Sequence, residues 1–193
     1  MARADNLYEL PKDLPVPQDD GACAHLRGMP LPALALPSTR GGTVDLSSHP
    51  GRIVVFCYPR TGRPDVAQAQ GWDQIPGARG CTPQACAFRD HYAELKAFGI
   101  SEVYGLSAQD TAYQREAAER LGLPYPLLSD EKLELAKALG LPMFEVEGVT
   151  LIKRVTLIAH AGRIEHAFYP VFPPDANAPA VIHWLMERTT AGH

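Results

Sequence analysis

One apolar run near the middle of the chain constrains the fold more than any other feature of the sequence. Residues 52–59 read RIVVFCYP, and the six side chains from Ile53 to Tyr58 contain no charged residue and no break in the apolar pattern. A strand with one face in water alternates apolar and polar residues, whereas a strand covered by helices on both faces is apolar throughout. We therefore expect residues 52–59 to form a central strand of a sheet with helices on both sides.

The segments around this strand alternate between strand-like and helix-like patterns. Before it, residues 31–48 read as a strand, a Gly-Gly turn and a second strand. After it, the patterns predict a helix over about 82–98, a buried strand at 102–108 and a helix ending at Leu121. A short helix over 131–140 follows, with Gly140 at its end. The last elements are a strand-turn-strand unit over 150–170, with its turn at Ala161-Gly162, and a helix over about 177–188. This order is that of a thioredoxin-like fold: an α/β domain with a mixed central sheet flanked by helices and preceded by an N-terminal hairpin.

The first thirty residues differ in composition from the rest of the chain. They contain four prolines and the sequence Asp19-Asp20-Gly21. This composition is typical of an extended arm that packs along the domain, and not of a separate domain. We therefore divide the 193-residue chain into an extended N-terminal arm at 1–30 and one thioredoxin-like domain at 31–193, which is long enough to bury a proper core.

Composition and charge argue against several kinds of partner. A net charge of -4 without a Lys/Arg cluster gives no footprint for nucleic acid. No segment approaches the roughly 18 apolar residues of a membrane span, and the start lacks the apolar core of a signal peptide, so we expect no membrane association and a cytoplasmic location. Four cysteines in such a chain do not indicate a disulfide framework. Cys57 is expected to be a buried core thiol, and Cys23 an incidental thiol or a redox partner.

Two of the cysteines, Cys81 and Cys86, lie five positions apart in GCTPQACAFRD, where a helix is expected to begin. Residues five apart on a helix are separated by about 7.5 Å along the axis and turned by about 140° from each other. A disulfide needs Cα atoms about 4.4–6.8 Å apart and converging side chains, so these thiols can bond only if the first turn unwinds. The pair suits a reaction cycle with a folded and an unwound form better than a static crosslink.

The two thiols differ in their expected reactivity. Cys81 falls where the loop meets the helix, with Thr82 and Pro83 as start signals, so unpaired N–H groups and the positive end of the helix dipole favour its thiolate. Cys86 lies about one turn further along and suits attack on an oxidised Cys81. The alternatives are two thiols near one helix start by chance, and a zinc site that includes His91. The spread of the three side chains around the helix disfavours zinc.

With these residues in view, the chain resembles peroxiredoxins of the Q type, the bacterioferritin comigratory protein group. The resemblance runs over about residues 31–185. Its strongest part is GCTPQACAFRD at 80–90, and IVVFCYP at 53–59, YPLLSD at 125–130 and KRVTLIAHAGRIEHAF at 153–168 support it. A Cys-x4-Cys pair alone would be a weak signal, but in this order and with these flanks the match is specific.

The resemblance implies a thiol peroxidase that reduces hydrogen peroxide and organic hydroperoxides and needs no cofactor or metal. Cys81 would be the peroxidatic cysteine, whose thiolate attacks the O–O bond and becomes a sulfenic acid. Cys86 would be the resolving cysteine, which forms an intramolecular disulfide with Cys81 after the helix start unwinds. A thioredoxin or a similar dithiol protein would reduce that disulfide. Proteins of this type are often monomers, so we expect a monomer or a weak dimer.

Two further positions carry over from the family. Its arginine falls on Arg154, in LIKRVTLIA, where an always-charged, forked donor would hold both the thiolate and the peroxide oxygens. Its proline, which shields the thiol, falls on Pro59, with Tyr58 before it. By contrast, Arg89 in AFRD is expected to be a structural ion-pair partner.

The chain departs from the family pattern in front of the first cysteine. That pattern is Pro-x-x-x-Thr-x-x-Cys, but the residue three before Cys81 is Ala78, and a long loop at 60–80 precedes the helix. Thr61 is the candidate for the missing hydroxyl if the extra residues loop out behind it; the alternative is an ordinary turn residue. Trp72, within the loop, either covers the site as a lid or packs on the surface.

Two other classes of function stay open. A general thiol–disulfide oxidoreductase or redox sensor on the same fold is expected to carry Cys-x-x-Cys, not Cys-x4-Cys. The third class is a non-catalytic domain that binds a partner through the 60–80 loop. Such a domain would have no need to retain the four motif residues, which are Pro59, Cys81, Cys86 and Arg154.

Overall fold

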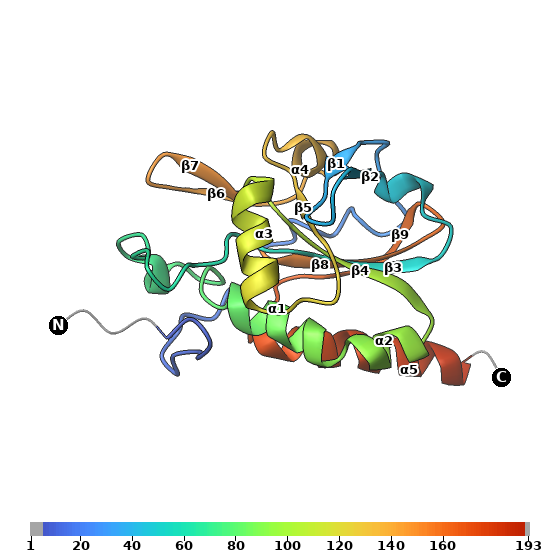
Figure 1. Cartoon of the computed structure of the whole chain (residues 1–193). Helices are drawn as coiled ribbons and strands as arrows, with labels where there is room; N and C mark the ends of the chain where they lie inside the picture. The colour runs from blue at the N-terminus through green and yellow to red at the C-terminus, as the bar shows by residue number, and fades with distance from the viewer. Residues whose placement is uncertain (1–5, 192–193) are drawn as a thin grey trace.

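A five-stranded mixed sheet forms the centre of the protein (Figure 1). The structure is a computed structural model that describes residues 6–191; residues 1–5 of the expected arm and residues 192–193 lie outside this range. The strand order is β5-β4-β3-β8-β9, in which the first three strands run parallel and the last two are each antiparallel to the strand before them. The strands are β3 (Arg52–Cys57), β4 (Ile100–Ser107), β5 (Leu127–Ser129), β8 (Val155–His160) and β9 (Arg163–Phe168).

Strand β3 occupies the middle of this sheet, as its apolar run predicts. It pairs with β4 on one side and with β8 on the other, and residues 53–57 are all buried. Phe56 packs into one core cluster and Val55 into another, because successive side chains of a strand point to opposite faces. The sheet therefore has a hydrophobic core on each face.

Different elements cover the two faces (Figure 1). Three helices pack on the Phe56 face: α1 (Cys81–Asp90), α2 (Tyr92–Ala97) and α5 (Asn177–Ala191). The Val55 face is covered by α4 (Glu134–Leu139), by the 3-10 helix η1 (Leu46–Ser48) and by the N-terminal segment around Cys23 and Leu26. Helix α3 (Thr111–Arg120) packs beside β5.

Local signals end two of these elements where the sequence predicts. Gly140, at φ 62°, caps α4 with the left-handed conformation that glycine adopts readily. Ala161 and Gly162, both at positive φ, form the tight turn between β8 and β9. The opening hairpin is present but short, with only β1 (Leu36–Pro37) and β2 (Thr43–Val44).

Two elements differ from the expectations. The helix expected over 82–98 is interrupted at His91, which ends α1 and begins α2. The strand expected from residue 150 is divided, because β7 (Val149–Ile152) pairs with β6 (Met143–Val146) in a separate hairpin and β8 starts only at Val155. The two residues left between these strands, Lys153 and Arg154, belong to neither, and this break frees Arg154 from the sheet.

Within residues 6–191, no helix is long and apolar enough to cross a bilayer. Over the same range, no group of three or more His, Cys, Asp or Glu side chains is placed to hold a metal ion.

Candidate active site

Cys81 is the first residue of α1, as the sequence predicts. Gly80 caps the helix with φ 108°, a conformation that L side chains rarely adopt, and turns the chain into the helix. Cys81 is only 4% exposed and packs in the same cluster as Tyr58 and Ala85. The helix start therefore presents the thiol to the protein interior, beside unpaired backbone N–H groups.

Arg154 is in direct contact with this thiol. Its Nη2 lies 3.2 Å from Cys81 Sγ and also donates to the carbonyl oxygens of Ala78, at 3.0 Å, and Arg79, at 3.3 Å. The guanidinium is 3% exposed. The structure thus brings together two residues that are 73 positions apart and that the sequence assigns to one site. A permanent positive charge therefore lies against the sulfur.

A buried polar network holds the guanidinium from its other side. Arg154 Nη1 donates to Gln84 Oε1, and Gln84 Nε2 donates to Asn177 Oδ1 at 2.9 Å. Thr156 Oγ1 donates to the same Asn177 oxygen at 2.7 Å. None of these three residues is predicted from the sequence as part of the site. The available signals were the i+3 spacing of Gln84 from Cys81 and the i+2 spacing of Thr156 from Arg154.

Pro59 is buried and follows directly after β3 and Tyr58. The Tyr58 N–H donates to the Leu106 carbonyl at 3.0 Å, so the chain leaves the sheet only at the proline. Tyr58 packs in the same apolar cluster as Cys81. A shielding role for Pro59 at the thiol stays a prediction.

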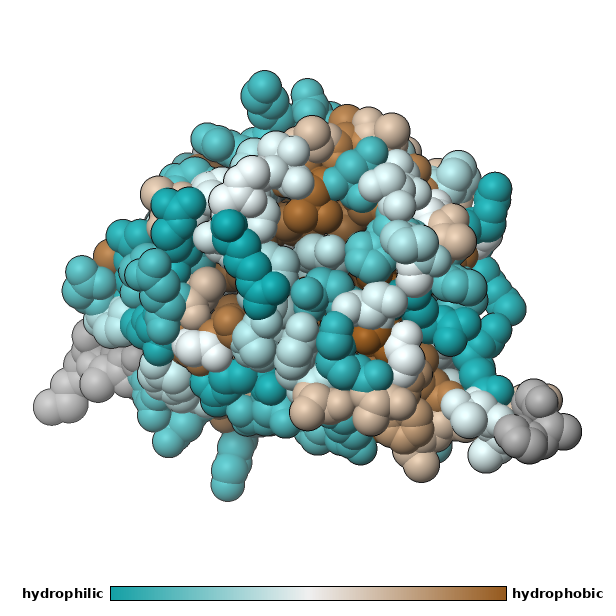
Figure 2. All heavy atoms as spheres, turned by 45° about the vertical axis from the view of Figure 1, so that its right-hand side comes forward, coloured by the Kyte–Doolittle hydropathy of each residue, from teal (hydrophilic) through white to brown (hydrophobic). Residues whose placement is uncertain are grey.

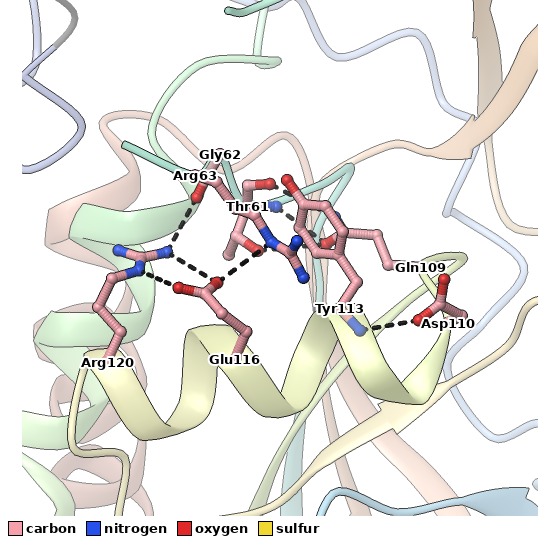
Figure 3. Close-up of polar contacts among 8 residues, drawn as sticks. All are labelled: Thr61, Gly62, Arg63, Gln109, Asp110, Tyr113, Glu116 and Arg120. Carbon is pink, nitrogen blue, oxygen red and sulfur yellow. Dashed lines mark hydrogen bonds and ion pairs between the residues drawn. The ribbon is translucent and has the colours of Figure 1, made fainter. Parts of the chain in front are cut away.

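Thr61 is also buried, and its hydrogen bonds to other described residues go to Gln109 (Figure 3). Its hydroxyl donates to Gln109 Oε1 at 3.3 Å, its N–H donates to the same oxygen at 3.0 Å, and its carbonyl accepts from Gln109 Nε2 at 3.3 Å. The contacts of Cys81 Sγ are with Arg154 and with the Ala78 carbonyl, at 3.7 Å. A role for the Thr61 hydroxyl at the thiol therefore stays a prediction.

Cys86 lies one turn inside α1 and is half-buried. Burial raises its thiol pKa, and the Asp90 charge adds to this effect, while Arg89 and Arg120 oppose it. All four cysteines are free thiols. With α1 intact, Cys86 is thus a protonated thiol at neutral pH on a different side of the helix from Cys81.

The long 60–80 loop is a packed structure in its own right. Trp72, in the 3-10 helix η2 (Trp72–Gln74), is buried; the Arg60 guanidinium lies 4.5 Å from the centre of its ring, and the Phe144 ring centre lies 6.2 Å away. Ala78 belongs to the same apolar cluster. The β6–β7 hairpin, which contributes Phe144, therefore supports the segment whose carbonyls accept from Arg154.

Most of the chain is similar to known redoxins. The redoxin family model matches residues 26–182. Peroxiredoxin Q, chloroplastic, from Oryza sativa subsp. japonica is 33% identical over 152 residues, which are 78% of this chain and 62% of that protein. Peroxiredoxin Bcp from Escherichia coli (strain K12) is 31% identical over 162 residues, 81% of this chain and 93% of that one. The crystal structure of peroxidoxin BcpB from Mycobacterium tuberculosis has a TM-score of 0.68 at 26% identity and covers 83% of this chain and 96% of its own.

These matches confirm the α/β redoxin, or thioredoxin-like, fold with its mixed sheet and small N-terminal hairpin. The chain spans about three fifths of the length of the rice and wheat relatives, with 62% of each covered. It spans nearly all of the Escherichia coli protein. The chain belongs to the peroxiredoxin Q/Bcp family of redoxins.

Proposed function

We propose that the protein is a thiol peroxidase that reduces hydrogen peroxide and organic hydroperoxides with the Cys81 thiol. The observation that carries this proposal is the 3.2 Å contact between Arg154 Nη2 and Cys81 Sγ at a helix start. The thiolate is the nucleophile in peroxide reduction, and the guanidinium places a permanent positive charge beside the sulfur. Its N–H groups also supply donors for the oxygen on which negative charge develops.

In the first step, the thiolate attacks one oxygen of the hydroperoxide. The S–O bond forms and the O–O bond breaks, and the leaving oxygen takes the bonding electrons and a proton to become water or an alcohol. Cys81 becomes a sulfenic acid, oxidised by the two electrons that the peroxide gains. Pro59 shields the sulfur during this step, and Arg154 holds the reacting atoms.

In the second step, the Cys86 thiolate attacks the sulfenic sulfur. The S–S bond forms, and the hydroxyl leaves as water after taking a proton. In the intact helix the two residues are about 7.5 Å apart along the axis and about 140° apart around it, so the first turn of α1 has to unwind before they can bond.

A dithiol protein of the thioredoxin type completes the cycle. It supplies two electrons through a mixed disulfide and returns both cysteines to thiols. The relatives include chloroplast and bacterial proteins, so a cytoplasmic location for this chain is likewise a proposal.

The test is mass spectrometry of the reduced protein after one equivalent of hydrogen peroxide. We expect a rapid loss of two hydrogens, mapped to peptides joined through Cys81 and Cys86. Cys81→Ser should not be oxidised rapidly, whereas Cys86→Ala should stop at a sulfenic acid that a dimedone probe captures. Cys57→Ala, which removes a buried thiol of β3, is the matched control and should still form the disulfide.

Full turnover in Cys81→Ser would rule out the assigned nucleophile. A disulfide that joins Cys81 to Cys23 would leave the peroxidase in place but would move the resolving role away from Cys86.

A further inference from the structure

Arg79 lies two residues before Cys81, and its side chain is buried although it is charged. A buried guanidinium costs free energy unless its N–H groups are paired. Two distant segments supply the acceptors. Arg79 Nη1 donates to Asp73 Oδ1 of η2 at 3.2 Å, and its Nη2 donates to the Asn6 carbonyl of the arm at 2.9 Å. The Arg79 side chain is therefore fixed both by the 60–80 loop and by the arm.

The backbone next to this side chain contacts the guanidinium of Arg154. The carbonyl oxygens of Ala78 and Arg79 accept from Arg154 Nη2, at 3.0 and 3.3 Å. The same nitrogen lies 3.2 Å from Cys81 Sγ. A terminal guanidinium nitrogen carries two N–H groups. Two carbonyl oxygens and one sulfur thus share two donors, so the positions of the carbonyls decide how the nitrogen faces the sulfur.

Arg79 is the polar anchor of this backbone segment. The family pattern has a threonine at position 78, whereas Ala78 carries only a methyl group, which packs in an apolar cluster with Trp72. Gly80, on the other side, has no side chain. Among residues 78–80, only Arg79 therefore has a side chain that can form hydrogen bonds.

We propose that Arg79 is a positioning residue for the oxidation of Cys81. Its side chain, held by Asp73 and by the arm, fixes the carbonyls of residues 78 and 79, and these carbonyls fix the Arg154 guanidinium against the sulfur. The inference rests on the proposed peroxidase function. It makes the rate of the first step depend on contacts with the arm and with η2.

The test measures the second-order rate constant of Cys81 oxidation by hydrogen peroxide with stopped-flow kinetics. We expect Arg79→Gln to lower this rate constant roughly tenfold, because small displacements of positioned groups slow a reaction steeply. Arg79→Lys keeps a cation beside Asp73 and should be oxidised faster than Arg79→Gln; equal rates would overturn the proposal. Arg52→Gln is the matched control, since it removes an ion pair with Glu165, at 2.7 Å, and should keep the wild-type rate.

A double-mutant cycle tests the contact with Asp73. Asp73→Asn keeps the size of this side chain and removes its charge, and it should lower the rate constant by less than Arg79→Gln does. The double variant should be no slower than Arg79→Gln alone, because both changes remove the same interaction. Losses that add up in the double variant would contradict a role for Asp73 that acts through Arg79.

A merely structural role of Arg79 predicts a different result. Arg79→Gln would then lower the free energy of unfolding but leave the rate constant of Cys81 oxidation unchanged. That outcome, or equal slowing in Arg52→Gln, would show that the positioning role is wrong while the peroxidase stands. If hydrogen peroxide does not oxidise wild-type Cys81, the proposed function fails first and the positioning role fails with it.

Discussion

Among single residues, Arg154 has more partners than contact with the thiol alone requires. Its two terminal nitrogens donate to Gln84 and to two backbone carbonyls in addition to Cys81 Sγ. Gln84 donates in turn to Asn177, so a buried polar chain runs from the thiol to the start of α5. A buried network of this kind holds its members in place only while each one is paired. The position of Arg154 therefore depends on Gln84.

We expect Gln84→Leu to lower the rate constant of Cys81 oxidation by peroxide by roughly tenfold or more, because an unpaired Nη1 draws the guanidinium away from the sulfur. Stopped-flow kinetics would measure this. Gln114→Leu is the matched control, since Gln114 is an equally buried glutamine whose amide donates to Ser107 and Leu128. Both variants should lose stability, but only Gln84→Leu should slow oxidation; equal slowing in both would indicate general loosening of the core.

The sequence could locate Cys81 and Arg154 but not the residues that position them. The helix start and the family resemblance both point to Cys81, and the resemblance alone points to Arg154; the structure places the two residues in contact. Gln84 and Asn177 belong to the same network but are 93 positions apart, and nothing local to either residue signals the other. Pairings of this kind depend on the tertiary fold, which a single sequence does not display.

The elements were predictable wherever one local signal determined them. The apolar run of β3 and the glycine after α4 were such signals. The β6–β7 hairpin was missed because its strands are half-exposed and only its Glu147-Gly148 turn is distinctive, with positive φ at both residues. The burial of Trp72 was unpredictable for a related reason, since it depends on packing against that hairpin.

The start of α1 is the element on which the proposed cycle depends, and contacts from distant segments hold it in place. A side chain at Gly80 would place its Cβ 2.6 Å from Pro174 Cγ and 2.8 Å from Leu10 Cδ2, so both segments pack directly on the glycine. Arg79 is tied to the arm as well, because its Nη2 donates to the Asn6 carbonyl at 2.9 Å. Unwinding the first turn disturbs these contacts.

We expect Gly80→Ala to destabilise the helix start, by about 1–3 kcal/mol, because it adds a clash to an unfavourable positive φ. Hydrogen exchange at residues 81–84 and formation of the Cys81–Cys86 disulfide should both become faster. Gly99→Ala is the control, because Gly99 also has a positive φ but its Cβ would meet nothing within 4 Å. If the two variants formed the disulfide at the same rate, packing at Gly80 would have no part in the unwinding.

The molecule as a whole has a mostly polar surface and a core that contains buried thiols. Figure 2 shows one face that is mostly hydrophilic, with its apolar side chains in small separate patches. Large exposed apolar residues, such as Tyr8 in the arm and Met186 on α5, lie on different segments, as is normal for protein surfaces. A monomer or weak dimer stays the prediction. In the interior, the arm places Cys23 in the same cluster as Cys57 of β3.

This shared core makes stability depend on pH in alkaline solution. Burial raises the pKa of Cys23 to about 12, and the nearby charges of Asp20 and Asp19 add to the effect; burial also raises the pKa of Cys57. Both pKa values are higher in the folded than in the unfolded chain, where a thiol titrates near 9.0. The stabilisation is therefore complete below that pH and is lost above it, at about 1.4 kcal/mol per pH unit for each thiol.

We therefore expect the free energy of unfolding, measured with urea under reducing conditions, to fall as the pH rises from about 9 toward 12. The free energy of unfolding of Cys23→Ala should fall less steeply with pH than that of wild type, because this variant has no thiol proton to release at position 23. The difference between the two slopes should equal the contribution of one thiol. Met186→Ala, on the exposed face of α5, should keep the wild-type slope. Equal slopes for wild type and Cys23→Ala would mean that Cys23 titrates normally in the folded chain. In that case the arm would not bury this thiol against β3 in solution.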